Sequence, residues 1–287
     1  MKTLFLSDLD GTFLNSKGKI SPRSAEIIDF LTKNGVLFSV ATARTYATVM
    51  EMFKDINLPC PLVLMNGVTI YDPNKKQILK SNSIPTELGN RIVYEFRKRN
   101  IEPMLYFQQG EKLDIYYGEL TNNCQREYVA QRTDCNGKRF IYSPTPISLE
   151  GKNLVYIVCL DYYERIKDIY EAVSEFDDAH CMFYRDNYVP DMYYLEIITK
   201  NVSKASGVLT VKEMVSADKI VVFGDNLNDI PMFQVADECY AVSNAEKELK
   251  SIATAVINSN DEDAVAEFLL SMYKKQTDFQ QKAGIEV

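Results

Sequence analysis

The apolar run at positions 4–6 stops abruptly at two carboxylates, Asp8 and Asp10, and a glycine, Gly11. A continuous apolar run of this kind is typical of a strand buried on both faces in a parallel sheet. Ligands of open α/β sheets bind at the carboxyl ends of the strands, so the two acids lie where a site would form. Carboxylates held close together repel unless a cation or a shared proton relieves them, and Mg²⁺ is the expected cation. The start of the chain therefore predicts a parallel α/β sheet with an acidic site at its edge.

Predicted strands and helices alternate in both the first and the last part of the chain. In the first part, helical patterns separate three apolar runs at 4–6, 36–41 and 62–65. The alternation resumes near Val202, where a helix precedes the very apolar run 219–223. This order predicts an α/β protein with a Rossmann-like, doubly wound parallel sheet.

The segment from 83 to 192 has a different pattern. Its predicted helices and strands fit two αββ-like units, and it contains most of the tyrosines. Polar groups at the ends of predicted strands lie before and after this segment, so the second half of the chain must complete the sheet if those groups converge. We therefore expect a catalytic core of residues 1–82 and 193–287, with an inserted α+β cap domain at 83–192 that selects the substrate.

Composition limits the partners of the protein. A chain of 287 residues with 46% hydrophobic residues can fold around a full core. The 40 acidic residues outnumber the 32 basic ones, which gives a net charge of −8. Because this field repels nucleic acid and anionic membrane surfaces, we expect neither as a partner. The expected partner is a small phosphorylated metabolite, and the expected assembly is a monomer or a small homo-oligomer.

The cysteines and the N-terminus indicate the compartment. No two of the six cysteines form a C-x-x-C pair, and several lie in apolar runs, which is typical of reduced core thiols. The N-terminal residues lack the apolar stretch of a signal peptide, and no uncharged apolar run is long enough to span a membrane. We therefore expect a cytoplasmic protein. The cysteines are Cys60, Cys124, Cys135, Cys159, Cys181 and Cys239.

Three further stretches place polar side chains at the start or end of predicted elements. Thr42 ends the second strand, Lys204 opens a helix, and Asp225 follows the run 219–223 within Gly-Asp-Asn-Leu-Asn-Asp. Two acids and two asparagines after so apolar a strand are typical of oxygen ligands for a hard cation. Each of these stretches, like the first one at 8–11, has a simpler interpretation when it is taken alone. Asp-Leu-Asp-Gly suits a polar turn, and most single lysines lie on the surface. Their joint order favours a site.

The stretch Asp-Leu-Asp-Gly-Thr at 8–12 resembles the first motif of the haloacid dehalogenase superfamily, the aspartate-nucleophile phosphohydrolases. The three later stretches resemble its other motifs in the same order, and segment 83–192 resembles the cap of the Cof-like subfamily. The resemblance implies that Asp8 attacks phosphorus to form an aspartyl phosphate. It also implies that Asp10 protonates the leaving oxygen and then activates water.

The resemblance implies further contacts with phosphate and metal. The implied phosphate-binding residues are Leu9, Thr42, Ala43, Lys204 and Asn228. The implied Mg²⁺ ligands are Asp8, the backbone carbonyl of Asp10, Asp225 and Asp229. Asp229 could act through water or as an orienting neighbour instead of directly. Ala43 replaces a glycine that is usual in the second motif, so the approach of the backbone to phosphate can differ slightly.

Arg44 and Asn66 are weaker candidates for contacts with the substrate. Arg44 either binds the substrate or caps the helix that follows it, and the residues alone favour neither. Asn66 and Gly67 match an Asn-Gly pair of the Cof-like subfamily, although Asn-Gly is also a strong turn signal in its own right.

The leading hypothesis is a Mg²⁺-dependent phosphohydrolase that cleaves the phosphate monoester of a small metabolite. Sugar phosphates, pyridoxal phosphate and flavin mononucleotide all remain open as substrates. A phosphomutase on the same core is the nearest alternative. A phosphoreceiver module uses a similar set of acids, threonine and lysine, but it is much shorter than 287 residues. A metabolite-binding protein without activity is disfavoured because every expected catalytic position is filled.

Overall fold

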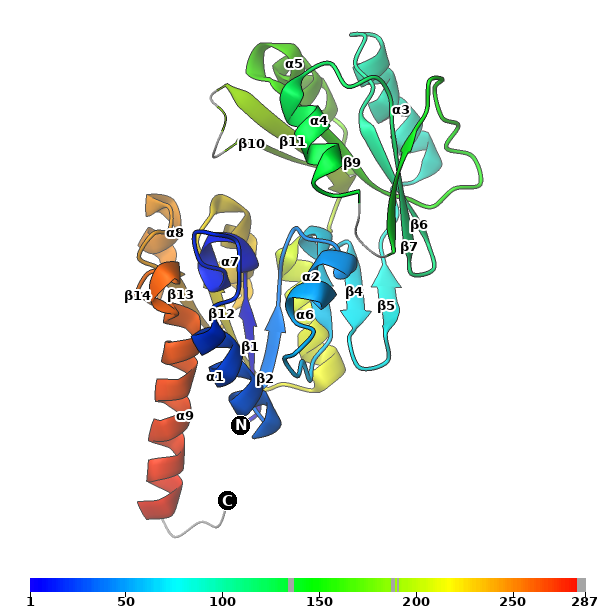
Figure 1. Ribbon diagram of the computed structural model, residues 1–287. Coiled ribbons are helices and arrows are strands. Elements are labelled where there is room, and N and C mark those ends of the chain that lie inside the picture. Colours follow the sequence, from blue (N-terminus) through cyan, green and yellow to red (C-terminus); the bar gives the residue numbers. More distant parts are fainter. Residues whose placement is uncertain (134–136, 187–188, 190, 283–287) are drawn as a thin grey trace. The chain divides into compact units, whose positions relative to one another are not determined.

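The computed structural model describes residues 1–133, 137–186, 189 and 191–282 (Figure 1). The chain divides into two compact units, Met1–Leu79 with Ser203–Val287, and Lys80–Val202. In the described part of the chain, no helix combines the length and the apolar character needed to cross a membrane.

A parallel sheet forms the centre of the first unit. Among the described residues its strand order is β14-β13-β12-β1-β2, and every neighbouring pair is parallel (Figure 1). This confirms the predicted Rossmann-like fold. The strands are β1 (Thr3–Ser7), β2 (Leu37–Val40), β12 (Lys219–Gly224), β13 (Glu238–Val242) and β14 (Ala255–Ile257).

The strand order places a topological switch point beside β1. The chain continues from β1 to β2 on one side, whereas β12, β13 and β14 extend the sheet on the other. Ser7 lies opposite Val40 on one neighbour and Phe223 on the other. The turns that follow these three strands therefore meet at one edge of the sheet, where open α/β sheets bind their ligands.

Helices flank this sheet and bury its apolar strands. Helix α1 begins at Pro22, where the side chain of Ser21 accepts a hydrogen bond from the backbone of Ser24 and the proline fits the first turn. Its Phe30 packs edge to face against Tyr273 of α9, with ring centroids 5.9 Å apart. The helices of this unit are α1 (Pro22–Lys33), α2 (Tyr46–Met52), α6 (Lys204–Val215), α7 (Ile230–Val235), α8 (Lys247–Ile252) and α9 (Ala264–Lys282).

The third apolar run belongs mainly to a small antiparallel sheet. Strand β3 (Leu62–Leu64) pairs with β4 (Thr69–Asp72), which neighbours β5 (Gln77–Ser81). Only an isolated parallel bridge from Ala41 to Val63 joins β3 to the end of β2. The backbone N–H of Thr42 donates to the carbonyl of Val63 at 2.9 Å beside this bridge, so β3 borders the end of β2 and pairs with β4 on its other edge.

A mixed sheet forms the second unit. Among the described residues its strand order is β10-β11-β9-β6-β7-β8, antiparallel except for the pair β7 and β8. Its strands are β6 (Met104–Gln109), β7 (Lys112–Tyr117), β8 (Lys138–Tyr142), β9 (Leu154–Tyr162), β10 (Ala179–Arg185) and β11 (Met192–Thr199). Its helices are α3 (Thr86–Arg97), α4 (Asn123–Ala130) and α5 (Tyr163–Ser174).

This unit differs from the predicted insertion in its extent and its content. It ends at Val202 instead of residue 192, because β11 pairs along its length with β9 and β10. The two αββ-like units correspond to α3 with β6 and β7, and to α5 with β10 and β11. Helix α4 and strand β8, which lie between them, were not predicted.

The described cysteines are free thiols. Burial raises the pKa of Cys60 to about 12, so little of this thiol is ionised at neutral pH. This matches the expected reduced thiols, while Cys135 lies outside the described residues. Three of the others are buried and two half-buried: Cys60, Cys159 and Cys239, and Cys124 and Cys181, respectively.

Candidate active site

The turns after β1 and β12 lie against each other. The backbone N–H of Asp8 donates to the carbonyl of Phe223 at 2.9 Å, which extends the pairing of the two strands by one residue. The hydroxyl of Thr12 donates to Oδ1 of Asp225 at 2.9 Å and joins the two turns. Thr12 lies within the first motif but was not among the predicted site residues.

Gly11 makes this close approach possible. Its φ is +81°, which a residue with a side chain adopts only with strain. A Cβ atom at this position would lie 2.3 Å from Oδ2 of Asp225. A glycine is therefore required between Asp10 and Thr12 if the two turns are to touch.

Lys204 places its ammonium between two buried carboxylates. Its Nζ lies 2.5 Å from Oδ1 of Asp8 and 2.6 Å from Oδ1 of Asp229. Only 2% of Lys204 is exposed, so water contributes little to the solvation of its charge. Ser203 and Ser206 form a capping box that fixes the first turn of α6, where Lys204 is located.

The Asn-Gly turn after β3 supports the start of α6. Met65, Asn66 and Gly67 all have positive φ values, and a Cβ on Gly67 would lie 2.1 Å from the carbonyl oxygen of Ser203. The backbone N–H of Asn66 donates to the carbonyl of Thr42 at 3.0 Å. The pair therefore forms the turn that the dipeptide predicts, and it also brings the ends of β2 and β3 close to α6.

Asp229 uses both carboxylate oxygens within the site. Oδ1 accepts from Lys204, while Oδ2 accepts from the backbone N–H groups of Asp225 and Asn226 at 3.0 and 3.1 Å. The residue is completely buried. Of the two roles left open by the sequence, this arrangement favours an orienting neighbour over a metal ligand that acts through water.

The electrostatic balance of the site is negative. Carboxylate oxygens of Asp8, Asp225 and Asp229 lie within 4.8 Å of one another. Burial raises the pKa of Asp8 well above its ordinary value, the charge of Lys204 acts to lower it, and the charges of Asp229 and Asp225 raise it further. Burial and the charge of Asp229 likewise raise the pKa of Asp225 to about 7.

Lys204 offsets only part of this negative charge. Burial acts to lower the pKa of Lys204, but the charges of Asp229 and Asp8 outweigh it, so that the pKa lies above its ordinary value. One ammonium thus faces three carboxylates. A hard divalent cation such as Mg²⁺ would relieve the remaining repulsion, and the all-oxygen donor set suits it. The residues present therefore fit a divalent metal.

Arg44 pairs with Asp10, which neither of its sequence interpretations anticipated. Its Nε donates to Oδ2 of Asp10 at 2.7 Å and its Nη2 donates to Oδ1 at 2.6 Å. The side chain of Asp10 is 56% exposed and that of Arg44 is 28% exposed. This two-pronged pair lies at the accessible side of the site, in contrast to the buried carboxylate of Asp8.

The remaining predicted phosphate-binding residues differ in their accessibility. Thr42 is buried, and its Oγ1 accepts from the backbone N–H of Arg44 at 3.2 Å, a bond that does not use the hydroxyl hydrogen. Leu9 is buried, whereas Ala43 and Asn228 are exposed. Hydrogen bonds and ion pairs thus join Asp8, Lys204, Asp229 and Asp225 in one set, and Asp10, Arg44 and Thr42 in a second set.

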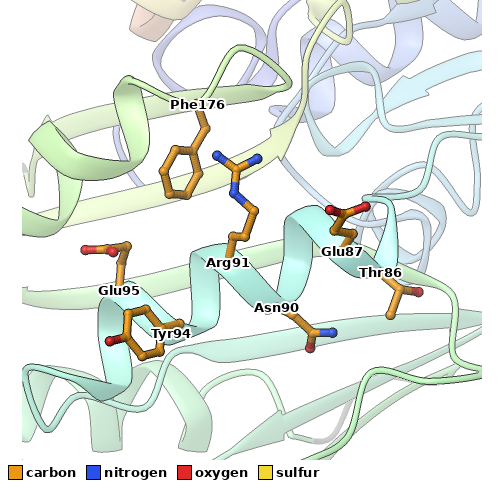
Figure 2. Close-up of a pocket in the computed structure, with 7 residues that line it drawn as sticks. All are labelled: Thr86, Glu87, Asn90, Arg91, Tyr94, Glu95 and Phe176. Carbon is orange, nitrogen blue, oxygen red and sulfur yellow. The ribbon is translucent and has the colours of Figure 1, made fainter.

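The second unit has a surface hollow of about 720 Å³ along α3 (Figure 2). The guanidinium of Arg91 stacks 4.1 Å above the ring of Phe176. The carboxylate of Glu95 binds Lys98 at 2.6 Å and Arg99 at 2.9 Å. Because neighbouring residues already pair with the charges of Arg91 and Glu95, contacts within the unit account for these side chains without a ligand.

Comparison with known proteins gives concordant results. A model of the haloacid dehalogenase-like hydrolases matches residues 5–269. The 5-amino-6-(5-phospho-D-ribitylamino)uracil phosphatase of Bacillus subtilis strain 168 is 27% identical over 281 residues, which cover 91% of this chain and 95% of that protein. The pyridoxal phosphate phosphatase of Escherichia coli K12 is 22% identical over 276 residues, which cover 92% and 96%. The structure of a haloacid dehalogenase-like hydrolase from Bacteroides thetaiotaomicron shares the fold, with a TM-score of 0.75 and 20% identity over 95% of this chain and 100% of that one.

Proposed function

The chain belongs to the haloacid dehalogenase-like hydrolases, and we propose that it is a Mg²⁺-dependent phosphatase that hydrolyses a small metabolite's phosphate monoester through an aspartyl phosphate. The observation that carries this proposal is the buried ammonium of Lys204 between Asp8 and Asp229. The charge of this ammonium favours the ionised form of Asp8 and so opposes the effect of burial. The ammonium also supplies the positive charge that an incoming phosphate requires.

Asp8 acts as the nucleophile. An oxygen of its carboxylate forms a bond to phosphorus, and the bond between phosphorus and the ester oxygen breaks. The carboxylate needs no base to remove a proton, provided that it stays ionised. Lys204 favours that state, whereas the neighbouring carboxylates oppose it.

Asp10 serves as acid in the first step and as base in the second. It gives a proton to the leaving oxygen, and then takes a proton from the water that attacks the aspartyl phosphate. This second step releases inorganic phosphate and restores Asp8. The exposed position of Asp10 suits contact with both the leaving group and water.

The pair of Arg44 and Asp10 adds a requirement to this scheme. The guanidinium lies 2.6 to 2.7 Å from both oxygens of Asp10 and so occupies the atoms that would meet the leaving group. A substrate phosphate offers Arg44 an alternative partner of the same geometry. We infer that the substrate competes with Asp10 for Arg44, and that the oxygens of Asp10 become available to the leaving group and to water when this pair separates.

Thr42, Lys204 and Asn228 bind the transferring phosphate. The hydroxyl of Thr42 retains a hydrogen for this purpose, and Asn228 is exposed in the turn that carries Asp225. Asp8, the carbonyl of Asp10 and Asp225 would hold Mg²⁺, with Asp229 as their orienting neighbour. When bound, the ion supplies positive charge that offsets the negative charge of the phosphate and the carboxylates.

The inserted unit is proposed to select the metabolite. Two relatives act on 5-amino-6-(5-phospho-D-ribitylamino)uracil and on pyridoxal phosphate, so similar chains differ in their substrates. The motif residues lie in the first unit and carry the shared chemistry. The second unit would then provide the contacts that distinguish one leaving group from another.

A screen for phosphate release tests the proposal. The full chain with MgCl₂ is incubated with a panel of phosphorylated metabolites that includes sugar phosphates and the substrates of the two relatives. Inorganic phosphate should appear with at least one of them, and the Asp8→Asn variant should release none above background. Conversion of a sugar phosphate into an isomer without free phosphate would instead identify a phosphomutase.

A further inference from the structure

We propose that Asn244, which follows β13, is a positioning residue that holds the catalytic turn at 9–14 against the turn of Asp225. This inference rests on the proposed function, because the two turns carry the groups assigned to catalysis. It concerns a residue outside the four motifs.

The side-chain amide of Asn244 is engaged at both ends. Its Nδ2 donates to the carbonyl oxygen of Gly11 at 2.8 Å, and its Oδ1 accepts from the backbone N–H of Asn260 at 3.1 Å. These two bonds fix the orientation of the amide, because exchanging its nitrogen and oxygen would place two donors or two acceptors face to face. Asn244 therefore connects the catalytic turn with the segment that follows β14.

The same short segment also contacts the other acidic turn. Two residues after Asn244, the backbone N–H of Glu246 donates to the carbonyl of Asp225 at 2.8 Å. The bond from Thr12 to Asp225 joins the two turns directly. Gly11, Asn244, Glu246, Asp225 and Thr12 thus form a closed ring of contacts beside the carboxylates.

Asn260 secures the far end of the catalytic turn. Its Nδ2 donates to the carbonyl of Leu14 at 2.9 Å, and its side chain is buried. The turn is therefore held at Gly11 by Asn244 and at Leu14 by Asn260. Gly11, the first of these anchors, has a left-handed φ, so the direction of its carbonyl is coupled to the placement of Asp10 and Thr12.

Because Asn244 is exposed, its role in positioning the turn can be tested separately from any contribution to the stability of the fold. The residue is exposed, and a hydrogen bond in contact with water contributes little to the free energy of unfolding. A small rotation of the catalytic turn, by contrast, would move Asp10 and its carbonyl relative to Asp225. Because reaction rates depend steeply on such geometry, loss of this bond should affect turnover and metal binding more than folding.

The test compares three variants of the full chain. Asn244→Ala removes the amide, and Asn244→Asp keeps an acceptor for Asn260 but cannot donate to Gly11. Asn74→Ala is the matched control, because Asn74 is also exposed and donates to a backbone carbonyl, that of Leu58 at 3.0 Å, away from the site. The measurements are the melting temperature, its increase over a MgCl₂ titration, and kcat and KM for p-nitrophenyl phosphate.

Both Asn244 variants should lower kcat by about 10- to 100-fold, with KM changed by less than about threefold. They should also require more MgCl₂ for the same rise in melting temperature, while their metal-free melting temperatures match that of Asn74→Ala. Wild-type kcat and an unchanged MgCl₂ titration in either Asn244 variant would overturn the proposal. So would a melting temperature far below the control combined with normal kcat per folded molecule, since that result describes a purely structural residue.

The proposed function can fail separately from this inference. If the wild-type chain hydrolyses no phosphate ester, the phosphatase assignment fails. The MgCl₂ titrations of melting temperature still compare Asn244→Ala with Asn74→Ala in that case. Equal titrations would then overturn the positioning role as well.

Discussion

The two units of the chain treat buried charge in opposite ways. In the first unit, one ammonium faces three carboxylates at the edge of the parallel sheet. In the second unit, two buried acids each pair with one cation. Asp161 binds Arg165 at 3.1 Å, and Asp114 binds Arg139 at 2.7 Å.

This difference distinguishes charged groups of a candidate site from charged groups that only stabilise the fold. A balanced pair lowers the cost of burying a carboxylate and requires nothing further. An unbalanced cluster raises the pKa of its own members and is stable in its ionised form only with an added cation or proton. The excess of negative charge in the first unit is therefore the physical sign of a site, and the balanced pairs of the second unit are signs of packing.

The largest effect is expected from Asp8→Asn. The substitution keeps the shape of the side chain but removes the nucleophile, so phosphate release should fall by at least about 10⁴-fold. Because burial already disfavours the charge of Asp8, the metal-free melting temperature should not decrease. Activity assays and thermal melts check both statements.

Asp161→Asn provides the matched change in the second unit. It leaves Arg165 without its counter-charge, which should lower the free energy of unfolding by about 1–3 kcal/mol. Turnover of p-nitrophenyl phosphate per folded molecule should stay within about threefold of wild type. If Asp161→Asn abolished turnover while folded, or Asp8→Asn retained it, the contrast between the units would not hold.

Removal of the second unit should have an intermediate effect. A short linker in place of residues 80–202 should leave some hydrolysis of p-nitrophenyl phosphate, because the motif residues all lie in the first unit. For the preferred metabolite, kcat/KM should fall by at least about 100-fold, or about 2.7 kcal/mol. Circular dichroism must first show that the shortened chain is folded. Unchanged discrimination among metabolites would place specificity in the first unit.

The smallest effect concerns pH. The pKa of Asp225 in the fold, about 7, lies above its unfolded value, so its proton favours the folded state at low pH. This contribution is lost as the pH rises through about 7. Mg²⁺ competes with the same proton. The rise in melting temperature caused by MgCl₂ should therefore be larger at about pH 8 than at about pH 5, and an equal rise at both would exclude Asp225 as a ligand.

The sequence was informative where polar residues end apolar strands. Asp8 and Asp225 follow two of the most apolar runs in the chain, and parallel pairing of β1 with β12 necessarily brings the ends of those runs together. The distance along the sequence does not matter to this inference, because strand ends in a parallel sheet share one edge. Lys204 was identified differently, from the resemblance of its stretch to the third motif of the superfamily and from its place where the chain returns to the core.

The second unit was predicted less completely because its buried faces are partly polar. Helix α4 buries Gln125, whose amide donates to the carbonyl of Leu160 at 2.8 Å. Strand β8 buries Lys138. Neither segment therefore shows the regular apolar spacing from which helices and strands are predicted.

Contacts between exposed side chains were also beyond prediction. Arg44 and Asp10 are 34 residues apart, and their pairing depends on the positions of two loops instead of two strands. Asn244 lacks a motif altogether, and only the hydrogen bond to Gly11 identifies it. Such contacts are found only in a three-dimensional structure, because no periodicity in the sequence encodes them.

Mapping the phosphorylated residue tests the central claim most directly. In Asp10→Asn, attack on a good leaving group should continue while hydrolysis of the intermediate slows, because one carboxyl is proposed to serve both steps. Rapid mixing with p-nitrophenyl phosphate and MgCl₂, acid quenching and peptide mass spectrometry should then find one phosphoryl group on Asp8. A phosphoryl group on any other residue would contradict the assignment of Asp8 as the nucleophile.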